Sequence, residues 1–503
     1  MSLKVSCPVP VMNERDDGDI IFNHKWDKLA MMKKYFDIWV LAALIGFHFI
    51  INSNRYYLVL LIVVLIVLNK SIRSILNSLW LVFLTIWPFS RGKYYDSIII
   101  PKADWGGGWD LTLGARILFS DILLVLIVYY LLTRRSKFKN QLLIKKYDRS
   151  TLAFLLLLVV VVAVSTIQSS FVHTSSYYLL RFIKLVLVYL IAKVVMADRL
   201  IAKKSIQVLI MILCLSIGLV IGQFINKGPL GLAVEENQAL YGWFANESRD
   251  MFRPGGLYID PNLVATWLAV FLPVGLIKGL TSKSKQYWQW IGILLGTASL
   301  IVVGSRASWV ISVLMGAGGV IYAKRHFKFY YPDLIINHGK KILIVILLIF
   351  SPMIVDRMRT INYIFGPKGG ATYRLNQVKM SGQYLISQPW GVGIGIFPYG
   401  SSLDFYGKQN DLQPTLVHNV LAQVGAETGM LGLVFYLGFL WFLIKAKLTE
   451  FSKTKTVFGL SMLLALSSMV LLLMVFPWFL HPKIAELFWI LAAFNYSYKV
   501  QWL

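Results

Sequence analysis

Cysteine and acidic residues are scarce in this chain of 503 residues, and the scarcity of cysteine already excludes two kinds of protein. The 2 cysteines are Cys7, in a polar N-terminal stretch, and Cys214, in an apolar run, so no disulfide framework is expected. No spacing of His, Cys, Asp or Glu typical of a metal site accompanies them. We therefore expect neither a metal ion nor another cofactor.

Charge of either sign is also sparse, since Asp, Glu, Lys and Arg make up 15% of the residues, against about 25% in ordinary soluble domains. Hydrophobic residues make up 57%, more than one soluble core would bury. Many uncharged runs, for example around 208–221, extend to the roughly 20 residues that cross a bilayer. This composition predicts an all-α polytopic membrane protein with about 12–14 transmembrane helices.

The apolar segments predict spans whose least certain members are 55–69 and 74–89, which are either two short spans or one re-entrant hairpin. The spans lie near 35–53, 55–69, 74–89, 116–133, 151–167, 177–197, 205–225, 261–280, 286–304, 306–323, 341–355, 429–446, 457–475 and 484–498. Four regions follow: an N-terminal tail 1–34, a transmembrane region 35–355, a long loop 356–428 and C-terminal transmembrane helices 429–503. The tail is polar and charged, so we expect the first span, and no cleavable signal peptide, to target the chain.

A net charge of +26 would suggest nucleic acid in a soluble protein, but here the loops divide by charge. The connections 134–149, 324–341 and 445–455 are rich in Lys and Arg, whereas 168–176 has none. By the positive-inside rule the basic loops and both termini are cytoplasmic, next to lipid headgroups, and no nucleic-acid partner is expected. The connections 90–115, 226–260 and 356–428 and the turn before Arg306 then lie on the outer face.

His418 and Asn419 lie where the long polar loop meets an apolar helix. A histidine there exchanges a proton near neutral pH at the membrane surface, which suits chemistry on a lipid-linked substrate. The alternative is a plain helix cap or hydrogen-bonding role. Glu427, nine residues on, is expected to support the histidine or the helix end, and not to be catalytic itself.

Arg306, in Gly304-Ser-Arg-Ala-Ser308, and Arg374, early in the long loop, are expected at the same outer interface as His418. The planar guanidinium binds phosphate oxygens at two points, so these arginines suit a lipid-anchored diphosphate. The alternative is that they only reach for lipid headgroups. Arg253 precedes a turn and the cap region around Asn262, where a structural role is favoured over a substrate contact.

Asp121, Arg181 and Lys184 lie within expected spans, where a charge needs a partner. We expect Asp121 to pair with Arg181 and Lys184 to face an outward cavity, with structural and substrate-binding roles both open.

Two further patterns, at 16–19 and 391–395, are weak indications of function. Asp16-Asp17-Gly18-Asp19 lacks a nucleotide fold after it, and Gly391-Val-Gly-Ile-Gly395 lacks the βαβ unit of a dinucleotide site.

Four segments, in this order, resemble the O-antigen ligase and polymerase superfamily of bacterial envelope-glycan enzymes. They are Arg253-Pro-Gly-Gly-Leu-Tyr-Ile-Asp-Pro-Asn262, Gly304-Ser-Arg-Ala-Ser308, Arg374 followed by Gln388-Pro-Trp-Gly-Val-Gly-Ile-Gly395, and His418-Asn419 followed by Glu427-Thr-Gly-Met-Leu-Gly432. The resemblance covers about residues 250–435, and Asp260 stands where the family more often has Asn.

The resemblance implies a metal-independent glycosyltransferase of the bacterial cytoplasmic membrane, acting on the outer face. Its donor would be a polyprenyl-diphosphate-linked glycan, and its acceptor a glycan or a lipid-anchored hydroxyl. Arg306 and Arg374 would hold the diphosphate and His418 would act on the acceptor. Ligase and polymerase remain open, and the alternatives are a flippase or transporter of lipid-linked glycan and, less favoured, an assembly scaffold.

Overall fold

The computed structural model describes most of the apolar part of the chain. The described residues are 36–47, 54–72, 74–89, 92–95, 115–134, 148–232, 253–258, 260–282, 287–330, 370–397, 417–477, 480–481 and 484–496, with isolated positions between 348 and 366. The N-terminal tail 1–34, the expected span 341–355 for the most part, and the centres of the loops 90–115, 226–260 and 356–428 lie outside them.

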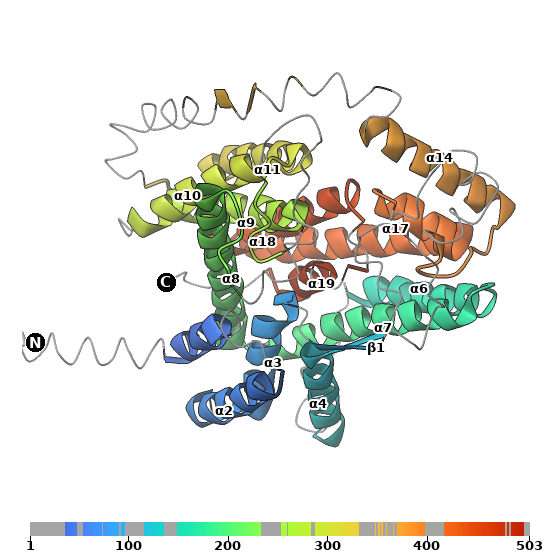
Figure 1. The fold of residues 1–503 in the computed structure, drawn as a ribbon, viewed down its shortest axis with the longest axis horizontal. Coiled ribbons are helices and arrows are strands. Elements are labelled where there is room, and N and C mark those ends of the chain that lie inside the picture. Colours follow the sequence, from blue (N-terminus) through green and yellow to red (C-terminus); the bar gives the residue numbers. More distant parts are fainter. Residues whose placement is uncertain are drawn as a thin grey trace, which may run out of the picture.

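The described residues fold into helices, with one antiparallel pair of strands, β1 (Gly92–Tyr95) and β2 (Ala115–Leu118). The helices, after a first one at Phe36–Phe47, are α2 (Asn54–Ile72), α3 (Ile75–Ile86), α4 (Phe119–Thr133), α6 (Arg149–Ile167), α7 (Val172–Val195), α8 (Arg199–Asn226), α9 (Pro261–Thr281), α10 (Tyr287–Val303), α11 (Arg306–His326), α14 (Gly370–Ser387), α17 (Val420–Thr454), α18 (Val457–Leu473) and α19 (Ala485–Ala493), with a 3-10 turn at Trp87–Phe89. Figure 1 shows α6 and α7 side by side, with α17 running alongside α6.

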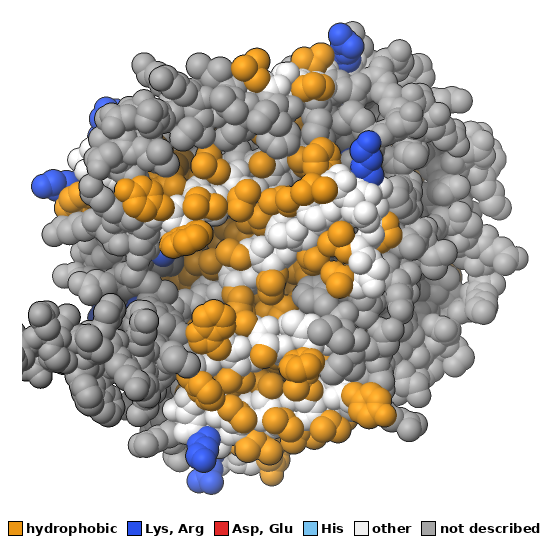
Figure 2. All heavy atoms as spheres, turned by 60° about the vertical axis from the view of Figure 1, so that its left-hand side comes forward, with side chains coloured by type: hydrophobic (Ala, Val, Ile, Leu, Met, Phe, Trp, Pro, Cys, Tyr) orange, Lys and Arg blue, Asp and Glu red, His pale blue; other side chains and the backbone are white. Residues whose placement is uncertain are grey.

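The chain is an all-helical polytopic membrane protein, as its composition predicted. Within the described residues, five helices (α6, α8, α9, α11 and α17) are long and apolar enough to cross a membrane, and six shorter apolar helices accompany them. Large apolar side chains face outward, among them Trp288 (82% exposed) and Val313 (69%). Figure 2 shows a face on which apolar side chains gather, with lysine and arginine side chains near its margins. Such a surface is stable only in contact with lipid or another apolar partner.

Polar caps set where the functionally important helices begin. The Asp260 side chain accepts a hydrogen bond from the Asn262 N–H (2.8 Å) and Pro261 is the first residue of α9, a favoured arrangement for a helix start. The Asn419 side chain accepts from the Ala422 N–H (3.0 Å) and starts α17 at Val420. This helix therefore begins before the span expected at 429–446, and Gly429 is a break inside it.

The segment expected as a long loop contains a helix, α14, which lies beside α17 (Figure 1). Its buried side chains, Gln377, Met380, Ser381 and Tyr384, recur at the spacing of one helical face. Met380 and Tyr384 pack into a small apolar cluster with Phe397, Val417 and others. The cluster fixes α14 over the start of α17.

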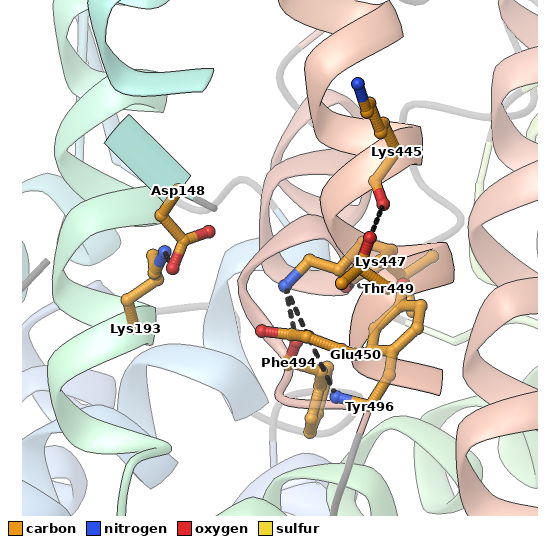
Figure 3. Close-up of polar contacts among 9 residues, drawn as sticks. Asp148, Lys193, Lys445, Lys447, Thr449, Glu450, Phe494 and Tyr496 are labelled. Carbon is orange, nitrogen blue, oxygen red and sulfur yellow. Dashed lines mark hydrogen bonds and ion pairs between the residues drawn. The ribbon is translucent and has the colours of Figure 1, made fainter. Parts of the chain in front are cut away.

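At the other end of α17, buried charges hold the C-terminal segment (Figure 3). Lys447 Nζ lies 3.2 Å from Glu450 Oε2 and donates to the Phe494 carbonyl (2.8 Å), while the Tyr496 N–H donates to Glu450 (3.1 Å). Nearby, Lys193 pairs with Asp148 at 2.7 Å. Because a helix rises about 1.5 Å per residue, Lys447 lies roughly 27 Å beyond the break at Gly429.

The predicted topology can be tested at two exposed positions. In a chain with Cys7 and Cys214 changed to Ser, we expect Ile386→Cys (83% exposed, at the end of α14) to react with a membrane-impermeant maleimide in intact cells. Ser452→Cys, exposed in the last turns of α17, should react only after permeabilisation. Ser381 is a poor probe because it is 3% exposed. The opposite labelling pattern would place α14 and His418 in the cytoplasm.

Candidate functional site

Arg253 ties together two helix starts. Its Nε donates to the Val303 carbonyl at the end of α10 (2.8 Å), and one terminal nitrogen donates to the Asn262 side chain at the start of α9 (3.4 Å). Gly256 in the same loop exchanges two backbone hydrogen bonds with the Gln223 side chain of α8 (2.8 and 3.2 Å). The structural role expected for Arg253 is therefore present, and Asn262 serves it.

Arg306 follows Val303 by a tight turn. Gly304 has φ of +69°, which turns the chain between α10 and α11. Ser305 is the N-cap position of α11 and its hydroxyl donates to Ser308 (3.1 Å). Arg306, half-buried, is the first residue of α11. The turn thus places the guanidinium-bearing residue next to the carbonyl that Arg253 holds.

Arg374 on α14 reaches the same region from the other side. Its guanidinium carbon lies 6.0 Å from the ring centre of Phe476, which follows α18. Burial lowers the pKa of Arg374, and the nearby Asp260 carboxylate opposes that shift, so the arginine stays charged. Burial also raises the pKa of Asp260. The hydrogen bonds from Asn262 and the charges of Arg253 and Arg374 oppose this shift without reversing it. Asp260 thus has both arginines as electrostatic neighbours.

His418 is oriented by Gln377, one turn after Arg374 on α14. The imidazole Nδ1 lies 3.3 Å from Gln377 Oε1, and the His418 backbone N–H points to the same oxygen at 3.4 Å. An amide oxygen only accepts, so in this contact the imidazole donates from Nδ1–H, which is the tautomer that carries its lone pair on Nε2. The neighbouring Asn419 side chain donates to the Met474 carbonyl at 3.1 Å.

These contacts bring together the starts of three helices, α9, α11 and α17. Arg253 and Arg374 take part in them, and Arg306 is the first residue of α11. Arg253 links α9 to the α10–α11 turn, Arg374 interacts with the Asp260 cap, and Asn419 and Arg374 both contact the segment 474–476. Helix starts carry exposed N–H groups and partial positive charge, which favour anions. The arrangement is suited to binding a dianionic group beside a histidine.

Glu427 lies behind this site. It is wholly buried, accepts from the Gln423 amide (3.2 Å), and has backbone hydrogen bonds from Gly395 and Phe397. The Glu427 carbonyl also accepts from the Gly393 N–H (3.0 Å). Gln423 and the 395–397 segment thus hold the Glu427 carboxylate inside the protein.

The glycines of the 391–395 segment have a structural explanation. Gly391, Gly393 and Gly395 all have positive φ, and a Cβ on Gly391 would lie 2.3 Å from the Glu427 carbonyl oxygen. At Gly429 (φ +74°) a Cβ would lie 2.0 Å from the Pro389 oxygen. The loop therefore packs backbone against backbone on the break in α17, and no nucleotide is needed to explain its glycines.

The charge pairing expected within the spans was wrong. Asp121 pairs with Lys184 (2.8 Å), which also pairs with Glu486 of α19 (2.9 Å), while Arg181 donates to the Leu480 carbonyl (2.9 Å) and covers the rings of Tyr177 and Tyr178. Glu486 supplies the second carboxylate beside Lys184, after that of Asp121. With two carboxylates beside it, Lys184 is poorly suited to a diphosphate.

Two residues of these sites were not singled out in the sequence. Gln377 carries no signal there, since a glutamine on an amphipathic helix is ordinary. Glu486 does carry one, because a carboxylate within the expected span 484–498 requires a buried partner. His481 lines a cavity together with Arg181 and Lys184.

Comparison with known proteins supports one family. Residues 291–437 match the profile of the family described as O-Antigen ligase. The match spans α10, α11 and α14 and the first half of α17, and so includes Arg306, Arg374 and His418. No curated protein matches the chain. The match confirms the resemblance drawn from the sequence motifs.

The break at Gly429 gives a stability prediction. Gly429→Ala should lower the free energy of unfolding by on the order of 3 kcal/mol, because it forces a glycine-only conformation on alanine and a clash with Pro389. Gly382→Ala in α14 is the matched control: a Cβ there meets nothing within 4 Å, and alanine favours the helix. Thermal unfolding in detergent measures both. Equal melting temperatures would show that the loop does not depend on the break.

Proposed function

We propose a glycosyl transfer at this site, from the premise that residues 291–437 match the O-antigen ligase family. Members of that family assemble envelope glycans as ligases or polymerases. In our proposal the donor is a polyprenyl-diphosphate-linked glycan, and the acceptor is a hydroxyl of another glycan or of a lipid-anchored molecule. The reaction takes place on the outer face of the cytoplasmic membrane.

The observation that carries the proposal is the joining of three arginines and three helix starts at one end of the bundle. Arg306 and Arg374 bind the diphosphate oxygens, and the start of α11 adds its N–H groups. Arg253 is held by Val303 and Asn262, so its charge acts from a fixed position. These positive charges neutralise the negative charge that grows on the departing diphosphate.

His418 supplies the proton chemistry. Its Nδ1–H is held by Gln377, so Nε2 accepts the proton of the acceptor hydroxyl as that oxygen attacks the anomeric carbon. The new C–O bond forms as the bond to the diphosphate oxygen breaks, and the lipid diphosphate leaves with the bonding electrons. A single displacement of this kind inverts the anomeric centre. Gln377 acts as a positioning residue, with Asn419 holding the start of α17.

The arginines provide a test that preserves charge. Arg374→Lys and Arg306→Lys should each lower transfer at least about tenfold at normal protein levels, because lysine is a point charge and loses two-point phosphate recognition. Arg325→Lys, in the last turn of α11, is a matched control and should transfer normally. Transfer is measured with purified lipid-linked donor. Normal turnover in both site variants would mean that these arginines only anchor their helices.

His418→Ala should lower turnover by about 10²–10⁴-fold and cause lipid-linked glycan to accumulate, because it removes a positioned base. A lost hydrogen bond to Gln377 would cost only about 1 kcal/mol of stability. His326→Ala, exposed at the end of α11, is the matched control. His481 is not a neutral control, because it lines the cavity beside Lys184. Near-normal turnover of His418→Ala on purified donor would remove the base role.

A further inference from the structure

A second polar site lies between α4, α7 and α19. It is an open hollow of about 420 Å³, a volume that includes the solvent at its mouth, so it receives the edge of a larger molecule and does not enclose one. The polar residues that line it are Asp121, Tyr177, Arg181, Lys184, His481 and Glu486. Glu486 is 2% exposed, and its Oε2 has no hydrogen-bond partner among the described residues. A buried carboxylate oxygen without a partner is costly, so it points to a ligand that donates a hydrogen bond.

The charges of this cavity distinguish it from the arginine site. Asp121 and Glu486 flank the Lys184 ammonium at 2.8 and 2.9 Å and offset its charge. Arg181 is held by the Leu480 carbonyl and lies 5.7 Å from the ring centres of Tyr177 and Tyr178. The two carboxylates offset the charges of Lys184 and Arg181, so these four groups offer a diphosphate no net positive charge, whereas the carboxylates accept hydrogen bonds from hydroxyl groups.

Only a short stretch of chain separates the cavity from the arginine site. Phe476, beneath Arg374, is four residues before Leu480, the partner of Arg181, so the chain path between them is at most about 14 Å. Gly395, whose N–H bonds to Glu427, packs so closely on Tyr178 that a Cβ would lie 2.1 Å from its ring. A glycan whose reacting sugar lies at His418 could extend a few sugars and reach this cavity.

We propose that the cavity of Asp121, Tyr177, Lys184 and Glu486 binds the hydroxyl-bearing edge of a neutral sugar in the glycan, so that it selects the glycan and the arginine site holds the diphosphate. This inference rests on the proposed glycosyl transfer. The carboxylates accept from sugar hydroxyls, the Lys184 ammonium donates to one, and the Tyr177 ring provides an apolar wall. The sugar belongs either to the donor glycan or to the acceptor.

Binding without turnover tests the inference separately from the transfer reaction. The full-length protein in detergent is titrated with three probes: the oligosaccharide released by mild acid from the lipid-linked glycan of the producing cells, the oligosaccharide released from their finished envelope glycan, and inorganic diphosphate. Saturation-transfer NMR reports which probe binds. The first oligosaccharide binding alone assigns the cavity to the donor glycan, and the second alone assigns it to the acceptor.

Glu486→Gln should weaken oligosaccharide binding about tenfold or more, because it removes a charged acceptor, while diphosphate affinity stays within about twofold. Tyr177→Ala, at the half-exposed wall, should do the same and decides the question if Glu486→Gln does not fold. Arg374→Lys should show the opposite pattern. Glu450→Gln, another buried carboxylate paired with lysine but at the far end of α17 (Figure 3), should bind all probes normally.

The inference is overturned if the unmodified protein binds neither oligosaccharide, or if Glu486→Gln and Tyr177→Ala both retain its affinity. It is also overturned if these variants lose diphosphate and keep the oligosaccharide. Glycosyl transfer would remain possible in each of these cases. Conversely, normal turnover of His418→Ala would contradict the catalytic proposal and leave the sugar-binding result unaffected.

Discussion

The backbone contact between the 389–395 loop and the break in α17 determines the geometry of the whole site. The Val392 and Gly393 N–H groups donate to the Ala426 and Glu427 carbonyls (3.1 and 3.0 Å), and Met430 N–H donates to Pro389 (3.0 Å). An uninterrupted helix would use those carbonyls internally, so the break at Gly429 makes them available. Since the loop follows α14 directly, the same bonds help to position α14, whose Gln377 contacts His418.

Charge is sorted along the bundle into three kinds of environment. Three arginines and three helix starts make the first region positive, and Asp260 is the carboxylate that faces Arg253 and Arg374 there. In the second, carboxylates flank Lys184 on both sides. At the far end, Lys447 and Lys193 are each paired with a carboxylate and hold helices and chain end together. In the second and third regions each of these lysines is offset by a carboxylate, so of the three regions compared the first offers net positive charge to a bound anion.

The sequence predicted those features that follow from local rules. The long apolar segments predicted helices, and the Asp260-Pro261-Asn262 cap predicted the start of α9. Arg306 lies at the start of α11, as its motif predicted. It did not predict long-range contacts, because these depend on helix rotation and packing. For that reason the partner of Asp121 is Lys184 and not the expected Arg181. Gln377 likewise contacts His418, which lies 41 positions away in the chain. The glycines of 391–395 were recognisable but explicable only once α17 was seen to break.

The residues of the two proposed sites differ in whether they lie within the segment that matches the O-antigen ligase family, and this bears on how an enzyme with two such sites would come to accept different glycans. Arg306, Arg374 and His418 lie within residues 291–437, whereas Asp121, Tyr177, Lys184 and Glu486 lie outside. Leaving-group binding and proton transfer are the same whatever sugar is transferred, so one segment can carry both. Sugar selection differs between glycans and is better placed on elements that vary independently. In the proposed arrangement the chain contributes backbone carbonyls next to both sites, Met474 to Asn419 and Leu480 to Arg181, and these contacts do not depend on which side chains stand at positions 474 and 480.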